Sequence, residues 1–304
     1  MMTDTDPFAG EYFTSLRELA ARQRFGPKDR LGSVNLIDAA ARLRAAGSVV
    51  TGETYSLSRA LEPGHNARGD ERPAFAIEVF SGEYGVMCFS SDHVELDCHG
   101  HNNTHLDGFN HMGLDRTWYG GWSVDDAEGP SIFDFASQGL ITRGVLADIP
   151  AVRGTDWVSA DEPVTDEDLD LAIKASGVTF EPGDALLLYM GRDRYEAAGE
   201  AYYVGDPITE KRPGVGHTGA RWIAEHDVSV LAWDFMDANL PGVEPSVCVH
   251  MLLWAIGLVL VDNCDFSSLV PAMRGASSAT GQFIVAPLRI ERATGCNVNP
   301  LVIL

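Results

Sequence analysis

Four of the nine histidines of the chain lie within the thirteen residues from His99 to His111, in the stretch 97–111 (DCHGHNNTHLDGFNH). In an extended strand, alternate side chains share a face. The odd-numbered residues of the stretch would then lie on one side: His99, His101, Asn103, His105 and Asp107. Two imidazoles and one carboxylate are a ligand set of catalytic metal sites that leave a coordination position for water, whose pKa the ion lowers. Clustered imidazoles and a carboxylate are costly to desolvate without a cation, so the stretch predicts a divalent metal site.

The elements before this stretch are predicted to be strands, because β-branched and aromatic residues dominate 55–61, 74–80 and 84–98. Short apolar runs bounded by Gly, Pro or Asp predict further buried strands at 143–150, 184–191, 228–235, 258–263 and 282–290. Apolar residues at three- and four-residue intervals predict helices at 14–24, 37–46, 165–177 and 216–227, the third with a capping box of Thr165 and Asp168. This pattern, without repeats or linkers, indicates one α/β domain.

Composition excludes several classes of function. The chain has 304 residues, 45% hydrophobic, and a formal net charge of −22, which repels phosphate backbones and anionic lipids. Nucleic acid and membranes are therefore not expected partners, and a small-molecule substrate is. Five cysteines without CxxC spacing predict reduced thiols, and no secretory signal or membrane-spanning run is visible, so we expect a cytoplasmic protein.

The segment 101–111 (HNNTHLDGFNH) resembles the HxGTHxDxPxH signature of the cyclase/kynurenine-formamidase-like metal-dependent hydrolases, which include the isatin hydrolases. The likeness extends over nearly the whole chain. FGPKDRLGSVNLI resembles the N-terminal WGxDDxxGxxN segment of that family, and RPGVGHTGARWIAEHDVSVLAWD resembles its PGL-helix-strand segment. VHMLLWAIGLVLVDN resembles the H-x11-E/D-N segment.

The resemblance implies a role for each matching residue. His101, His105 and Asp107 would be the primary metal ligands, and His111 would be the general acid/base. The distal ligands would be His250 and Asp262. The ion would be Zn²⁺ or Mn²⁺, with one ion expected and a second one possible, because imidazole and carboxylate suit both metals.

The resemblance also implies a swivelling β/β/α single domain over residues 1–304, with 1–50 as an N-terminal helical lid segment. It implies homo-oligomers, either dimers or tetramers.

Several positions depart from the signature. Asn103 replaces a glycine, but asparagine is the residue other than glycine that most often adopts a left-handed backbone, so we expect the turn to be retained. Gly108 and Phe109 replace a small residue and proline, which we expect to change the route from Asp107 to His111 and the shape of the pocket wall. Asp262 is one methylene shorter than the usual glutamate, and Phe25 replaces a tryptophan lid.

Other residues have two interpretations each. His99 is a further ligand or a bystander, and Asp234 and Asp237 are site residues or loop caps. Three aromatic residues follow the metal motif and either form a wall of the substrate pocket or pack in the core: Trp118, Tyr119 and Trp122. His217 and His226 are expected to be surface or capping groups.

The favoured function is a metal-dependent hydrolase that opens an amide, lactam, imide or lactone bond with activated water. The alternative is a lyase, a polyketide-type cyclase or dehydratase, using the same site. A third hypothesis is a metal-binding protein without catalysis. No phosphate loop or GxSxG elbow is present in the sequence.

Overall fold

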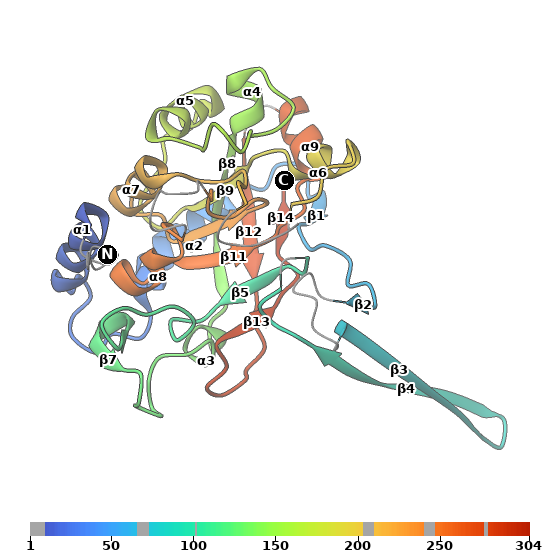
Figure 1. Ribbon diagram of the computed structural model, residues 1–304. Coiled ribbons are helices and arrows are strands. Elements are labelled where there is room, and N and C mark those ends of the chain that lie inside the picture. Colours follow the sequence, from blue (N-terminus) through green and yellow to red (C-terminus); the bar gives the residue numbers. More distant parts are fainter. Residues whose placement is uncertain (1–9, 66–72, 101, 203–209, 240–246, 277–278) are drawn as a thin grey trace.

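The computed structural model is built around one mixed nine-stranded sheet (Figure 1). The residues it describes are 10–65, 73–100, 102–202, 210–239, 247–276 and 279–304. Across the sheet, the strands run in the order β1 (Thr54–Ser56), β14 (Leu301–Ile303), β12 (Thr280–Val285), β8 (Leu140–Asp148), β9 (Ala185–Tyr189), β10 (Val230–Trp233), β11 (Val259–Asp262), β5 (His105–Asp107) and β13 (Gly295–Asn297). Strands β8 to β11 are parallel to their neighbours in that series, whereas β12 and β5 join it antiparallel.

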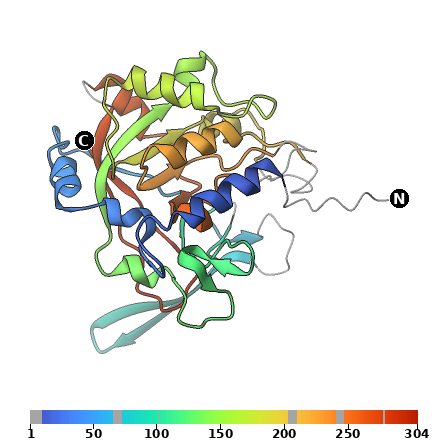
Figure 2. The same ribbon diagram turned by 90° about the vertical axis from the view of Figure 1, so that its left-hand side faces the viewer.

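The parallel strands form the core because both of their faces are covered. Every residue of β9, β10 and β11 is buried, which is typical of the continuous apolar runs of parallel sheets. Figure 2 shows α1 (Glu11–Ala21), α7 (His217–Glu225) and α5 (Asp166–Ser176) side by side over one side of the sheet. The predicted capping box of Thr165 and Asp168 begins α5, which confirms that prediction.

The remaining helices are short. They are α2 (Ala39–Ala46), α3 (Phe133–Ala136), α4 (Ile149–Arg153), α6 (Arg192–Ala197), α8 (Met251–Ile256) and α9 (Leu269–Gly275), with 3-10 turns at Gly32–Leu36 and Tyr119–Gly121. None of the helices in the described part of the chain is long and apolar enough to cross a membrane.

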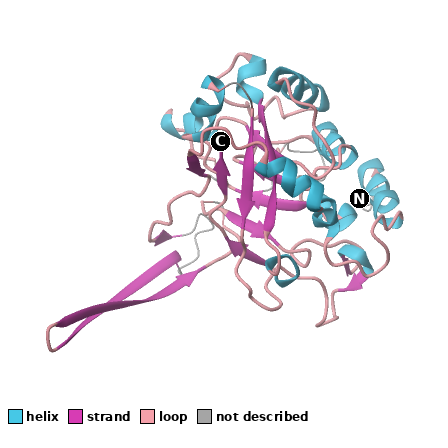
Figure 3. Ribbon diagram, turned by 180° about the vertical axis from the view of Figure 1, so that it is seen from behind, coloured by secondary structure: helices cyan, strands magenta, loops and turns pink. Residues whose placement is uncertain are grey.

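A long hairpin projects away from this body (Figures 1 and 3). Its strands are β3 (Pro73–Tyr84) and β4 (Met87–Leu96), paired antiparallel from Phe75 opposite Leu96 to Tyr84 opposite Met87. Strand β2 (Gly64–His65) pairs with β3 at its base. A second small hairpin joins β6 (Thr117–Trp118) and β7 (Trp122–Ser123).

The expected strand through the histidine stretch is wrong in extent. Strand β4 ends at Leu96 and β5 contains only His105–Asp107, so the described residues between them lie in a turn. The sequence pattern overestimated the strand because a turn held by side chains leaves no signature in the alternation of residue types. The alternation of side chains in a strand therefore explains the shared face of His105 and Asp107 only.

Candidate metal and catalytic site

Strand β5, the second strand from one edge of the sheet, carries the site residues His105 and Asp107. It lies between β11 and β13, with His105 opposite Asp262 of β11 and Asp107 opposite Gly295 of β13. Because His105 and Asp107 are two residues apart in a strand, their side chains project from the same face. The sheet order thus brings Asp262 to the histidine stretch, although the two are far apart in the sequence.

The imidazole of His105 is fixed by the turn that precedes it. Its Nδ1 lies 3.0 Å from the carbonyl oxygen of Asn103, and a carbonyl can only accept a hydrogen bond. The proton therefore resides on Nδ1, and the lone pair of Nε2 faces the site. This Nε2 lies 3.6 Å from Asp107 Oδ1 and 3.9 Å from Asp262 Oδ2. His105 is thus held in the tautomer that a metal ligand requires.

Asp107 is a fully buried carboxylate at the centre of the cluster. Neither of its oxygens has a hydrogen-bond partner in suitable geometry among the described residues. Burial raises its pKa, but the surrounding imidazoles, that of His111 most strongly, lower the pKa below the usual range of an aspartate. An ionised carboxylate buried without well-aligned donors is costly, and a cation between it and the imidazoles would remove that cost.

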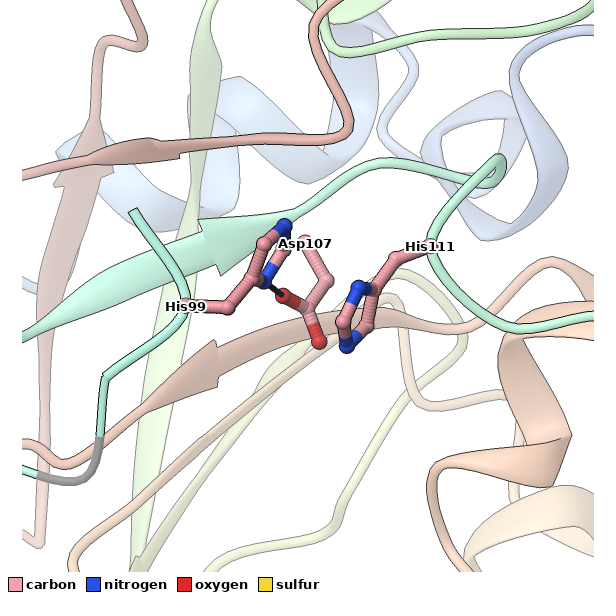
Figure 4. A group of neighbouring side chains, drawn as sticks. All are labelled: His99, Asp107 and His111. Atoms are coloured by element: carbon pink, nitrogen blue, oxygen red, sulfur yellow. Dashed lines mark ion pairs between the residues drawn. The ribbon is translucent and has the colours of Figure 1, made fainter. Parts of the chain in front are cut away.

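His99 and His111 complete one side of the cluster (Figure 4). His99 Nδ1 lies 3.0 Å from Asp107 Oδ1, and His99 Nε2 lies 2.9 Å from Thr294 Oγ1. The rings of His99 and His111 are stacked, with centroids 3.7 Å apart and planes 8° from parallel. Burial lowers the pKa of His111 from its ordinary value of 6.5 to about 4, so its ring is neutral at pH 7.

Asn103 holds the turn that brings His99 to this position. Its Nδ2 donates to the backbone oxygens of Asp97 and Cys98, at 2.8 and 2.9 Å. A Cβ at Gly100 would lie 2.0 Å from Asn103 Oδ1, so the turn requires glycine at that position. Asn103 is not among the described residues with positive φ, so the turn is formed without a left-handed backbone at this position. Its amide, and not its backbone conformation, shapes the turn.

A second group of residues lies on the β11 side of Asp107. His250 Nε2 lies 3.0 Å from Asp262 Oδ2 and 3.8 Å from Asp107 Oδ2. Asp237 binds the other ring nitrogen of His250, Nδ1, through Oδ2 and accepts the backbone N–H of Val249 through Oδ1. Asp262 Oδ1 accepts the indole N–H of Trp233 at 2.6 Å, which aims Oδ2 at the imidazoles.

The described residues therefore form two candidate ligand groups. One contains His99, Asp107 and His111, and the other contains His105, Asp107 and Asp262. Asp107 belongs to both. The shorter side chain of Asp262 does reach the cluster. His101 lies outside the described residues.

Two buried residues that the sequence analysis did not single out, Arg192 and Asn263, stabilise the turn between β4 and β5 through hydrogen bonds. Arg192 is 1% exposed and donates from Nη1 to Asn263 Oδ1 at 2.6 Å. Asn263 Nδ2 in turn donates to the backbone oxygens of Gly100 and Asn103. Asn263 was present in the H-x11-E/D-N segment, whereas nothing in the sequence marks Arg192, which begins an ordinary short helix.

Asp234 serves the fold and not the site. Its carboxylate accepts the backbone N–H groups of Met190, Gly191, Arg192 and Phe235, and so holds the loop after β9. His217 stacks on Tyr12 and His226 on Trp222.

An open pocket of about 640 Å³ adjoins His111. Trp118 lines it, together with Met112 and Arg17 of α1. By contrast, Phe109 is fully buried against Tyr119 and Phe135.

Two other aromatic groups lie elsewhere. The ring of Trp122 is covered by Lys28 and Arg30. Phe25 lines a neighbouring cavity of about 480 Å³ near the end of α1, and Arg17 and Trp118 line both this cavity and the pocket beside His111.

The family model described as a putative cyclase matches residues 54–239, and the chain belongs to this family. A solved structure described as a novel cyclase has a TM-score of 0.80 at 20% identity, covering 95% of this chain and 99% of that one. Isatin hydrolase A from Labrenzia aggregata has a TM-score of 0.60 at 17% identity, covering 87% and 98%.

Isatin hydrolase A from Ralstonia solanacearum has a TM-score of 0.59 at 18% identity, covering 87% of this chain and 95% of that one. No curated protein matches the chain. At these identities the structural likenesses show a shared fold. They confirm the predicted α/β class, a swivelling β/β/α single domain, and the predicted resemblance.

Proposed function

We propose that the chain is a metal-dependent hydrolase that opens an amide, lactam, imide or lactone bond of a small molecule. The observation that carries the proposal is the buried carboxylate of Asp107 surrounded by imidazoles beside an open pocket. The isatin hydrolases that share the fold are named for hydrolysis of isatin, a cyclic amide, which supports this bond class.

The donor set fits a divalent ion. His105 and Asp107 would hold it. The third ligand would be either His99, whose Nδ1 lies 3.0 Å from Asp107 Oδ1, or His101. Imidazole and carboxylate ligands suit Zn²⁺ or Mn²⁺, and His250 and Asp262 would serve a second ion that shares Asp107. When bound, such an ion polarises a carbonyl and makes water acidic enough to act as a nucleophile near neutral pH.

The residues of the chain supply orientation and proton transfer. The neutral ring of His111 accepts a proton from the attacking water on one nitrogen and delivers it to the departing nitrogen or oxygen of the substrate. The parallel ring of His99 restricts the plane of His111. The pocket beside His111 admits a small molecule, with Trp118 offering an apolar face.

The alternative is a cyclase or dehydratase, which the description of the family favours. Oxygen transfer separates the two, because only a hydrolase takes a solvent oxygen into its product. We expect a panel of N-formyl amines, cyclic imides, lactams and lactones to reveal a substrate for the metal-loaded protein. Turnover in ¹⁸O-labelled water should then add one label to the product. An unlabelled product formed by ring closure or loss of water would favour the lyase.

A further inference from the structure

The cavity of about 480 Å³ at the end of α1, which we call the α1 cavity, has the size of a ligand site. It is lined by α1 and the residues after it, by the turn Tyr119–Gly121, and by the C-terminal ends of α7 and α8. Figure 2 shows α1 and α7 side by side. Most of the lining residues are apolar, among them Leu19, Ile223 and Trp254. Sites for small molecules are likewise mostly apolar and measure roughly 300–1,000 Å³.

Polar groups in the wall of the α1 cavity already have partners within the wall. The indole N–H of Trp254 donates to Thr117 Oγ1 at 2.9 Å. The guanidinium of Arg24 pairs with the carboxylate of Asp227. A charged or strongly hydrogen-bonding occupant would lose its hydration without gaining these groups as partners, which is costly. The wall therefore favours an occupant that is neutral and apolar.

The α1 cavity shares part of its lining with the pocket beside His111. Arg17, Asp115 and Trp118 line both. The residues that follow His111 in the chain, 112–118, form much of the pocket and lead directly to the α1 cavity. A ligand whose reactive bond lies at His111 therefore needs only to pass Trp118 to extend beneath α1.

The shared lining is held by an exposed ion pair on an unusual turn. Arg17 donates from Nε and Nη2 to the two carboxylate oxygens of Asp115, at 2.7 and 2.9 Å. The two side chains are 36% and 51% exposed, and exposed ion pairs contribute little to stability. Asp115 and Arg116 both have positive φ, at 50° and 54°, which is uncommon outside glycine and recurs in switch regions. The contact between α1 and this turn therefore opens at low cost.

We propose that the α1 cavity binds the neutral hydrocarbon tail of the substrate whose polar end reacts beside His111. Separation of Arg17 from Asp115 admits the tail. The inference rests on the proposed hydrolase function and narrows the substrate class to amphipathic amides or esters, with an uncharged tail on the side away from the scissile bond.

Binding is tested without turnover, on the purified full-length protein. N-alkylmethanesulfonamides with butyl, hexyl, octyl and decyl chains present a neutral polar end that is not hydrolysed. Their affinities follow from displacement of the neutral fluorescent probe N-phenyl-1-naphthylamine. We expect the affinity to rise about two- to fourfold per added methylene, as for transfer of a methylene from water to an apolar site. A carboxylate at the end of the octyl chain should weaken binding at least about tenfold.

Two variants fill the α1 cavity from different helices. Ala224→Phe on α7 and Ala20→Phe on α1 should each abolish the dependence of affinity on chain length, so the result does not depend on the folding of one variant. Ala175→Phe is the matched control, because it adds the same ring at an exposed position of α5 that lines neither cavity, and it should keep the full dependence. Equal affinity for all chain lengths in the native protein, or a dependence that both filling variants retain, would overturn the tail site.

The role of the ion pair is tested by the rate at which the probe binds. Asp115→Asn removes the charge at a position where asparagine tolerates the positive φ, so it should raise the association rate in stopped-flow measurements. An unchanged rate would overturn the role of this pair.

Turnover separates the tail site from the proposed function. N-alkylformamides of the same chain lengths should be hydrolysed to alkylamine and formate, with water supplying the new oxygen of formate and the departing nitrogen taking the proton. The kcat/KM of the metal-loaded protein should rise with chain length as the affinity does. Hydrolysis with a kcat/KM that is independent of chain length would overturn the tail site and retain the hydrolase. Binding that depends on chain length, without hydrolysis of any formamide, lactam or lactone that carries such a tail, would refute the hydrolase and support the cavity as a binding site.

Discussion

Replacing Asp237 with asparagine should lower the affinity for a divalent metal about 10- to 100-fold, although Asp237 is not a proposed ligand. Both ring nitrogens of His250 face carboxylates that can only accept hydrogen bonds, Nδ1 facing Asp237 and Nε2 facing Asp262. Burial lowers the pKa of His250, but these two carboxylates raise it well above its ordinary value. A bound ion would displace the proton from Nε2, while Asp237 holds the proton on Nδ1. The amide introduced by Asp237→Asn would keep an oxygen for the N–H of Val249 but would turn its NH₂ group toward His250. The proton would then move to Nε2, and the ligand would be blocked.

The magnitude follows from this change of tautomer. A tenfold to hundredfold loss corresponds to about 1.4–2.7 kcal/mol, which is comparable to the loss of one hydrogen bond to a charged group. Competition with a chromophoric chelator, carried out on the chelator-stripped protein with Zn²⁺ and with Mn²⁺, measures the affinity directly. Thermal unfolding of the metal-free variant checks that the fold is intact.

Asp170→Asn is the matched control, because Asp170 accepts the indole N–H of Trp222 on an exposed helix face, away from the cluster. It should bind metal as the wild type does. If Asp237→Asn also binds with wild-type affinity at every stoichiometric step, then His250 is not a ligand or its tautomer is not set by Asp237. Wild-type affinity of Asp237→Asn would therefore refute the reasoning about the distal group.

The remaining predictions concern the other imidazoles. His105→Ala should lose bound metal by elemental analysis, whereas His111→Ala should retain it while turnover falls roughly 10²–10⁴-fold; equal metal loss in both would make His111 a ligand. His99→Ala should lower metal content as His105→Ala does, and full retention would assign the third position to His101 alone. The pKa of His111 is lowered to about 4, so its ring stays able to accept a proton as the pH falls. The acidic limb of kcat/KM should therefore lie below pH 5, and a limb near the ordinary value of 6.5 would contradict the assignment.

The sequence was informative where a residue's neighbours in the chain decide its structure. The runs that became β9, β10 and β11 are apolar without interruption, which is typical of strands covered on both faces. Thr165 and Asp168 mark the beginning of α5 through a local capping box. Each of these signals is contained within a few consecutive residues.

Contacts across the sheet could not be predicted in the same way. Asp262 lies opposite His105 only because β11 and β5 are neighbours in the sheet, and nothing in either segment specifies that order. The hydrogen bond from His250 to Asp237 likewise joins a loop after β10 to the residue before α8. The family resemblance identified His250 and Asp262 as ligands. The orienting role of Asp237 could be recognised only from the three-dimensional arrangement.

The turn before β5 shows why residue alternation alone misplaces His99. Alternation put His99 on the same strand face as His105, yet the two are joined by a turn that Asn103 ties to Asp97 and Cys98. His99 still reaches Asp107, because Asn263 holds the other side of the turn at Gly100. Its position thus depends on amide side chains and not on backbone pairing. Substitution of Asn263 should therefore displace His99 more than it disturbs His105, whose position β5 fixes independently between two neighbouring strands.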